Sequence, residues 1–200
     1  MVREMSCKPE ERMSGAGEGT SDEQLMLAFA SGITPAFEEL YARYRNPLSG
    51  FFRRRLKEPS VADELAQETW MAVVRSAPHY RPSATFRTYL YSIALKQLRS
   101  FRRKAAFRAM FWSSEEIEPA TARGTDSAFV LRDAVARLEA IDREVVMLRE
   151  FEELSYAEIA ALLSLPVNTV RSRLFRARMA LRDLLQGTVQ ADVSRQKEGV

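Results

Sequence analysis

The sequence contains one cysteine, Cys7, and one histidine, His79, in 200 residues. A single cysteine cannot form an internal disulfide, and this scarcity is typical of a protein from a reducing compartment. One Cys and one His, far apart in sequence, provide neither a zinc ligand set nor a Cys–His pair for nucleophilic catalysis. No glycine-rich phosphate-binding loop is present. We therefore predict no cofactor, no metal and no catalytic residues. The composition does not exclude catalysis by carboxylates alone, but no particular pair is marked, so the support for an enzyme is weak.

Long hydrophobic runs are also missing. Residues 1–20 contain no apolar core of a signal peptide, and no other stretch approaches the roughly 18 apolar residues that a membrane span needs. We therefore expect a cytoplasmic protein without membrane insertion. Residues 1–20 and 187–200 are predicted to be a disordered N-terminal extension and a disordered tail, and Met1, Met5 and Met13 are alternative start positions.

Charge of one sign is not in large excess, because the formal net charge is only +3, but the charges are segregated. The segment from Lys96 to Arg108 carries six basic residues and no acid. A second segment, from Val167 to Arg182, carries five arginines and no acid. Two separate basic segments predict two contacts with a polyanion, which is more specific than a high isoelectric point alone.

Apolar residues recur at helical spacing through most of the chain, and strand alternation is scarce. Candidate helix starts are Ser21 with Gln24, Thr34 before Pro35, and Ser60 with Asp63. Residues 105–127 are rich in acids, Pro, Gly, Ser and Thr, a composition typical of a linker. We predict an all-α protein with two small helical domains, 21–104 and 128–186, joined by a flexible linker at 105–127.

The stretch from Leu154 to Leu185 reads LSYAEIAALLSLPVNTVRSRLFRARMALRDLL. Ser155 and Glu158 stand at capping-box spacing, and Pro166 suits the end of one helix and the start of the next. Basic amphipathic helices are often merely solvated faces. The capped helix and tight turn before this one favour a helix-turn-helix whose second helix enters a DNA groove. The polar residues on its outward face are Asn168, Thr169, Arg171, Ser172, Arg173 and Arg176.

Another predicted helix carries an acidic outward face, formed by Asp63, Glu64, Gln67, Glu68 and Met71. Such a face is usually solvated. Met71 and Trp70 among the acids favour a protein-binding surface instead, since exposed apolar residues rimmed by charge are typical of interfaces.

The segment that follows is dense in aromatic and basic side chains. They include His79, Tyr80, Arg81, Arg87 and Tyr89. Aromatics interleaved with cations can stack the bases of a single strand. An ordinary loop held by core aromatics explains the composition equally well, and both interpretations remain open at this point.

These motifs together resemble the bacterial sigma-70 family, in its short extracytoplasmic-function (ECF) subfamily with sigma regions two and four. The resemblance covers about Asp22 to Leu185 and rests on AFEELYARY, ADELAQETW, TFRTYLYSIA and EELSYAEIA…TVRSRLFRAR, in that order. It implies a subunit, not itself an enzyme, that binds core RNA polymerase and promoter DNA to direct promoter-specific initiation. Many such proteins are held inactive by an anti-sigma factor, and we expect one here.

The resemblance also implies a role for each segment. The acidic face would dock on the clamp helices of the largest polymerase subunit. A −10 single strand would lie against His79, Tyr80, Arg81, Arg87, Tyr89, Lys96, Arg99 and Arg103. The −35 element would be read by Asn168, Thr169, Arg171, Ser172, Arg173 and Arg176. Lys96 and Ser100 replace an Asn and an Asp that are usual in the family, so the base specificity at −10 is not carried over.

Three other functions compete with this one. A stand-alone helix-turn-helix regulator would bind duplex DNA without polymerase. Lys96 to Trp112 would suit a membrane-surface or partner-binding amphipathic helix. A hydrolase or transferase comes third, because no catalytic site can be nominated for it.

Overall fold

The computed structural model describes residues 19–111 and 127–197, and within these ranges the regular structure is entirely helical. The elements are α1 (Asp22–Ala30), α2 (Thr34–Arg53), α3 (Pro59–Ser76), a 3₁₀ turn η1 (Ala77–His79), α4 (Phe86–Phe111), α5 (Ser127–Arg137), α6 (Ala140–Glu150), α7 (Tyr156–Leu163) and α8 (Val167–Lys197). The predicted all-α fold is confirmed. None of the helices in this part of the chain is long and apolar enough to cross a membrane.

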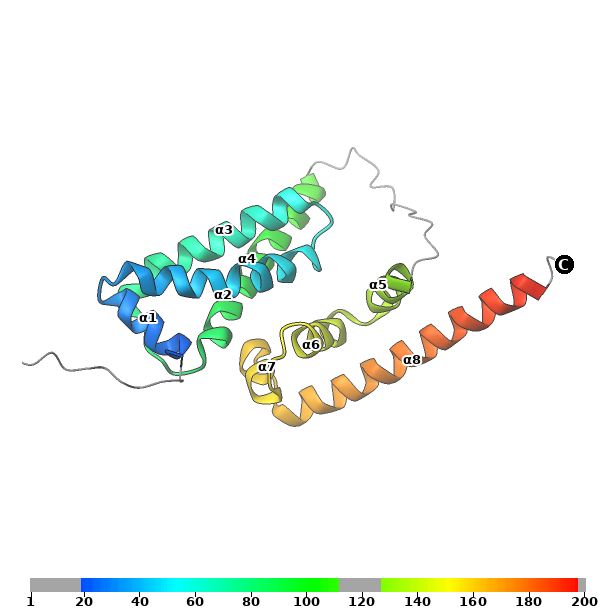
Figure 1. Ribbon diagram of the computed structural model, residues 1–200. Helices are drawn as coiled ribbons and strands as arrows, with labels where there is room; N and C mark the ends of the chain where they lie inside the picture. Colours follow the sequence, from blue (N-terminus) through cyan, green and yellow to red (C-terminus); the bar gives the residue numbers. More distant parts are fainter. Residues whose placement is uncertain (1–18, 112–126, 198–200) are drawn as a thin grey trace, which may run out of the picture.

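The N-terminal domain consists of α1 to α4. Helix α1 packs on α2, and α3 packs on both α2 and α4. Figure 1 shows these helices together as one bundle. The core is made by large side chains that are fully buried, among them Leu40, Phe51, Phe52, Phe86 and Leu90. These residues come from the apolar stripes of α2 and α4, so the periodicity of the sequence positions the inner faces of these helices.

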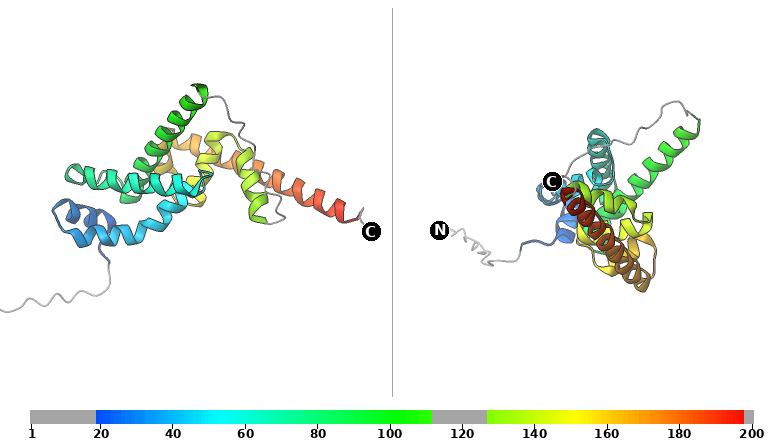
Figure 2. Two further views of the ribbon diagram at one scale, coloured as in Figure 1. Left: turned by 90° about the horizontal axis from the view of Figure 1, so that it is seen from above. Right: turned by 90° about the vertical axis from the view of Figure 1, so that its right-hand side faces the viewer.

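The C-terminal domain consists of α5 to α8. Helices α5, α6 and α7 all pack on α8. The buried side of α8 is formed by Val170, Leu174 and Ala177. Helix α8 then continues well past the other three helices, as the left view of Figure 2 shows. The N-terminal part of α8, next to α7, is therefore the part that packs against the rest of the domain, and we call it the held end of α8.

Two of the predicted helix starts are confirmed as capping boxes. The Ser21 hydroxyl accepts from the Gln24 amide (3.2 Å), and the Ser155 hydroxyl accepts from the Glu158 amide (3.2 Å). Two others differ. Helix α2 begins at Thr34 itself and α3 at Pro59, and neither start has a side-chain cap. A proline in the first turn has the helical φ and leaves one fewer unpaired N–H at the helix end, which explains why a serine or threonine cap is dispensable there.

Two helices continue past the predicted domain boundaries. Helix α4 continues to Phe111, beyond residue 104 where the linker was predicted to begin. Helix α8 continues to Lys197, through most of the predicted disordered tail. Ala105, Ala106 and Arg108 are good helix formers, which explains why α4 continues past residue 104. The remainder of the predicted linker and the extension at 1–18 lie outside the described residues.

The two domains touch each other. Helix α7 lies against α4, so segments about seventy residues apart in sequence become neighbours (Figure 1). Periodicity cannot predict such a contact, because it specifies which face of a helix is apolar and not which helix covers it.

Candidate nucleic-acid interface

The outward face of α8 lies at its N-terminal end, as the sequence predicted. Asn168, Arg171, Ser172 and Arg176 are exposed, whereas Val170 and Leu174 are buried. Ser172 donates to the Thr169 carbonyl (3.0 Å), and Arg171 donates to the Asn168 side chain (3.3 Å). These weak local bonds leave the polar atoms at the protein surface, where a recognition helix contacts base edges.

Arg173 is turned the other way. Its guanidinium lies 2.7 Å from Asp142 and 3.6 Å from Glu139, and its side chain is only 22% exposed. The sequence placed Arg173 with the base-reading residues, but the structure gives it partners at the start of α6. Arg178 is similarly paired with Glu150 of α6, at 2.6 Å. These ion pairs join α8 to α6. Arg171, Arg176, Arg178 and Arg182 are all exposed, and Arg171 and Arg176 lie nearest the start of the helix.

An aromatic residue that sequence analysis did not nominate shares the outward face. Phe175 is 67% exposed, between the buried Leu174 and the exposed Arg176. A phenylalanine so exposed on a polar helix face is unusual for a solvated surface and suits an apolar contact with a partner. Its position four residues after Arg171 was the available signal, since residues at this spacing share one side of a helix.

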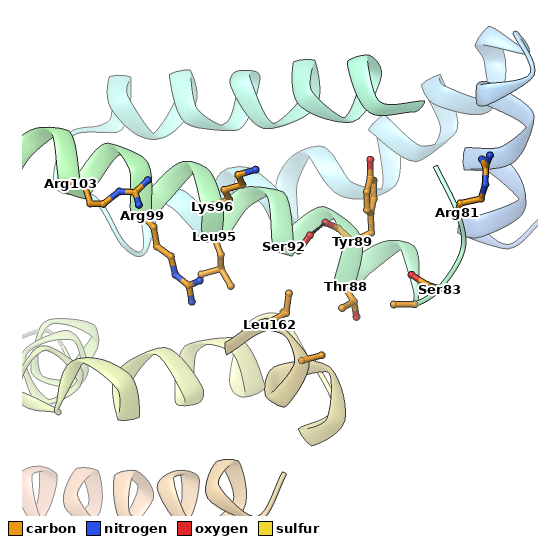
Figure 3. Close-up of a pocket in the computed structure, with 12 residues that line it drawn as sticks. Arg81, Ser83, Thr88, Tyr89, Ser92, Leu95, Lys96, Arg99, Arg103 and Leu162 are labelled. Carbon is orange, nitrogen blue, oxygen red and sulfur yellow. Dashed lines mark hydrogen bonds between the residues drawn. The ribbon is translucent and has the colours of Figure 1, made fainter. Parts of the chain in front are cut away.

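The second basic segment forms one row along α4. Lys96, Arg99 and Arg103 are exposed at intervals of three and four residues. Together with Arg81 and Tyr89 they line a groove of about 590 Å³, shown in Figure 3. The other wall of this groove belongs to α7, from which Leu162 points toward α4 (Figure 3). A groove with a cationic rim and an aromatic wall can hold a polyanionic strand.

Three of the aromatic-loop residues are less accessible than predicted. Tyr80 is 4% exposed, its ring lies 5.0 Å from that of Tyr89, and burial raises its pKa to about 12. It is therefore a core residue, so its prediction as a DNA contact is corrected. Tyr89 is half-buried, and its hydroxyl bonds Ser76 at 2.6 Å. Arg87 is also half-buried.

His79 and Arg81 are exposed, and Arg81 donates to the carbonyl of Tyr80 at 2.9 Å. The structure thus keeps part of the predicted loop surface open and uses the rest to fix the start of α4. Glu23 of α1 assists by accepting from the Phe86 amide at 2.7 Å, which satisfies one of the free N–H groups at that helix end.

The acidic face of α3 is as exposed as the sequence predicted. Its members Asp63, Glu64, Gln67, Glu68 and Met71 are all solvent-accessible, and Met71 is 51% exposed. Asp63 pairs with Arg53 at 3.0 Å.

Trp70 is different, because it is buried against Phe37 and Tyr41. The apolar character of the α3 surface therefore comes from Met71 and not from Trp70.

Among the residues that the structure describes, His, Cys, Asp and Glu side chains nowhere gather in the threes that a metal site requires. The candidate surfaces are instead extended, charged and spread over two domains. Such surfaces suit binding to large partners through many contacts.

Each of the two domains matches a known protein family. The Sigma-70 region 2 family matches residues 40–108, and the Sigma-70, region 4 family matches residues 128–181. The chain is 34% identical to RNA polymerase sigma factor CarQ of Myxococcus xanthus, over 85% of this chain and all of that protein. It is 30% identical to the ECF RNA polymerase sigma-E factor of Haemophilus influenzae, over 84% of this chain and 97% of that one.

A solved structure, CnrH in complex with the cytosolic domain of CnrY, is similar with a TM-score of 0.64 and 28% identity. It covers 83% of this chain and 97% of CnrH. The sigma factor RpoE of Bartonella quintana, in complex with the anti-sigma factor NepR, has the same TM-score at 24% identity and shares the fold.

Proposed function

The chain belongs to the sigma-70 family of RNA polymerase sigma factors, in its ECF group, and we propose how its surfaces divide the work of initiation. Helix α8 reads the −35 element, the α4 groove holds the −10 single strand, and the acidic face of α3 docks on the clamp helices of the largest polymerase subunit. The chain itself is an initiation factor without catalytic activity. The single observation that carries the proposal is the presence of two exposed basic surfaces on two domains that match regions two and four.

For the −35 element, the support is the exposed set Asn168, Arg171, Ser172, Phe175 and Arg176 at the held end of α8. Arginine pairs with guanine edges in the major groove, and each good pair contributes about 1–3 kcal/mol of discrimination. A phenylalanine on the same face can contact thymine methyl groups. Arg173 positions the helix through Asp142 and does not read bases.

For the −10 strand, the support is the row of Lys96, Arg99 and Arg103 beside Tyr89 and Arg81. The cations follow the phosphates, and the half-buried ring of Tyr89, which lines the groove, offers a stacking surface. The buried ring of Tyr80 packs against the ring of Tyr89 and so supports its position in the groove.

Further partners follow from the relatives. The solved relatives are bound to CnrY and to the anti-sigma factor NepR. We propose that an anti-sigma factor also binds this chain, and that the chain works in the cytoplasm, where the transcription machinery lies.

Run-off transcription with purified core polymerase and a promoter library tests the proposal. The wild-type chain should direct specific starts. The triple variant Glu64→Ala, Gln67→Ala, Glu68→Ala should lose most core binding, because these side chains lie in solvent and contribute to docking. Its stability should change by less than about 0.5 kcal/mol per site, as is usual for solvent-exposed positions.

A matched control is Glu38→Ala combined with Glu39→Ala, which removes exposed acids from α2 instead. Core affinity of this control should stay at the wild-type value. Specific DNA binding without any response to polymerase would favour a stand-alone helix-turn-helix regulator.

A further inference from the structure

The start of α4 depends on a side chain from α1. The Thr85 hydroxyl accepts from the Thr88 amide (3.2 Å), as the side chain of an N-cap residue does. The amide of Phe86, the first residue of the helix, donates instead to the carboxylate of Glu23, at 2.7 Å. Glu23 lies sixty-three residues earlier in the sequence. A carboxylate at a helix N-terminus satisfies a free N–H group and also interacts favourably with the helix dipole.

Helix α1 is itself fixed to its neighbours, which gives Glu23 a defined place. A capping box closes the first turn of α1. Asp22, the residue before Glu23, accepts a hydrogen bond from the hydroxyl of Tyr44 and pairs with Arg43 of α2 at 2.6 Å. Two adjacent carboxylates in one helical turn therefore join α1 to α2 and to α4.

Glu23 also lies near the other end of the loop at residues 80–85, which connects η1 to α4. Tyr80 begins this loop, and its ring is buried 5.0 Å from the ring of Tyr89. Burial, and next the negative charge of Glu23, raise the pKa of Tyr80 to about 12. The carboxylate of Glu23 is therefore close to Tyr80, where the loop begins, and to Phe86, where the loop ends.

This loop forms one end of the groove to which the −10 strand is assigned. Arg81 and Ser83 line the groove next to Tyr89, as Figure 3 shows. The Ser83 amide donates to the Arg81 carbonyl at 2.8 Å, and the hydroxyl of Tyr89 bonds Ser76 at 2.6 Å. The path of the loop thus decides where a cation and an aromatic ring meet an incoming strand.

We propose that Glu23 is a positioning residue for the capture of the −10 strand. Through its hydrogen bond to the Phe86 amide it fixes the start of α4, and with it the loop that carries Arg81 and the ring of Tyr89. Glu23 lies outside the groove lining, so it acts through the residues that do line the groove. The inference rests on the proposed −10 surface.

The benefit of a fixed loop is entropic. Unstacking a base costs free energy that the protein must recover from its contacts with that base. A loop that samples several conformations would lose further entropy when it becomes ordered on the strand. Apparent affinity also falls with the fraction of molecules that are competent to bind. If only about one molecule in ten keeps the binding conformation without the Glu23 bond, strand affinity falls about tenfold.

Three substitutions in the full chain separate the reach of the side chain from its charge. Glu23→Gln keeps the length of the side chain and an oxygen that accepts from the Phe86 amide. Glu23→Asp keeps the charge but withdraws the carboxylate by one methylene group. Glu23→Ala removes both. Amide hydrogen exchange at Phe86, measured by NMR, should be as slow in Glu23→Gln as in wild type, and faster in Glu23→Asp and Glu23→Ala.

The functional measurement is binding of a fluorescent single strand of mixed sequence and about twelve nucleotides, within the usual site size. Glu23→Gln should bind nearly as tightly as wild type, and Glu23→Asp and Glu23→Ala about tenfold more weakly. A merely structural role in α1 predicts a different order, because an acid in the first turn stabilises its own helix through its charge. Glu23→Asp would then match wild type, and Glu23→Gln would be the weaker variant.

The matched control is Glu39→Asp, which shortens an exposed acid of α2 that pairs with Arg43 at 2.9 Å. Its affinity for the strand should stay at the wild-type value. Circular dichroism checks that each variant keeps its helical content. If Glu23→Ala fails to fold, the order of Glu23→Gln and Glu23→Asp still decides the question.

Two results would overturn the proposal: slow exchange of the Phe86 amide in Glu23→Asp, or a strand affinity of Glu23→Asp that equals that of wild type. Arg99→Ala, which removes an exposed cation of the groove, separates this failure from failure of the proposed function. If Arg99→Ala weakens strand binding and Glu23→Asp does not, the −10 surface stands and only the role of Glu23 is wrong. If neither variant weakens binding, the assignment of the groove is wrong as well.

Discussion

The two basic surfaces of this protein are similar in sequence and different in accessibility. On α8, Arg171 and Arg176 extend into solvent from the held end of the helix. On α4, Lys96 and Arg99 are also exposed, but they face a groove whose other wall is α7. A helical stripe of arginines therefore identifies a candidate DNA surface, and the neighbouring domain decides whether that surface is available.

The largest expected effect comes from two adjacent residues of α8 with opposite environments. Leu174→Ala removes a side chain that is 2% exposed and should destabilise the protein by about 2–5 kcal/mol. Phe175→Ala removes one that is 67% exposed and should change stability by less than about 0.5 kcal/mol. Thermal unfolding measures both, and binding of −35 duplex by the Phe175 variant shows whether the exposed ring contacts DNA.

A stable Leu174 variant would mean that the inner face of α8 is not packed as described. Duplex binding that is unaffected by Phe175→Ala would restrict the reading surface to the polar residues.

An intermediate effect distinguishes two arginines that sequence analysis had grouped together. Arg173→Ala leaves the carboxylate of Asp142, 12% exposed, without its 2.7 Å partner and should cost about 1–3 kcal/mol of stability. Arg171→Ala should leave stability nearly unchanged and reduce discrimination among −35 sequences by about 1–3 kcal/mol. Chemical denaturation and competition binding with altered sites provide the two measurements.

The assignment of Arg171 to base reading would be wrong if Arg171→Ala weakened binding to every DNA sequence equally, since that result is expected for a phosphate contact. The assignment of Arg173 to positioning α8 would be wrong if the Arg173→Ala variant kept full stability and lost discrimination among −35 sequences.

The smallest effect concerns pH and the contact between the domains. Burial raises the pKa of Glu158, but hydrogen bonds from Thr88, Ser155 and Thr85 outweigh burial and lower the pKa to about 2, from an ordinary value of 4.5. A carboxyl group whose pKa is depressed in the folded state stabilises that state above its unfolded pKa. This contribution should be complete above about pH 4.5 and should be lost as the pH falls toward about 2.

Other carboxyl groups titrate in the same range, so the measurement is the difference between wild type and Glu158→Gln. At neutral pH the variant should be less stable by under about 1 kcal/mol. This difference in stability between wild type and variant should become smaller as the pH falls from 4.5 toward 2. A difference in stability that stays constant with pH would show that the charge of Glu158 has no part in the contact. Ser21 and Gln24 form a capping box without a charged member, so Gln24→Ala serves as a control that should show no such pH dependence.

The sequence by itself determined the helices, the two capping boxes, the acidic face of α3 and the buried side of α8. Each of these depends on residues within a few positions of one another, where helical spacing and local hydrogen bonds decide the outcome. Tertiary structure alone decided that Tyr80 is buried, that Arg173 belongs to Asp142, and that Glu158 contacts Thr85 and Thr88. These outcomes depend on residues up to seventy-three positions away, and periodicity carries no information about which side chains lie across a domain boundary.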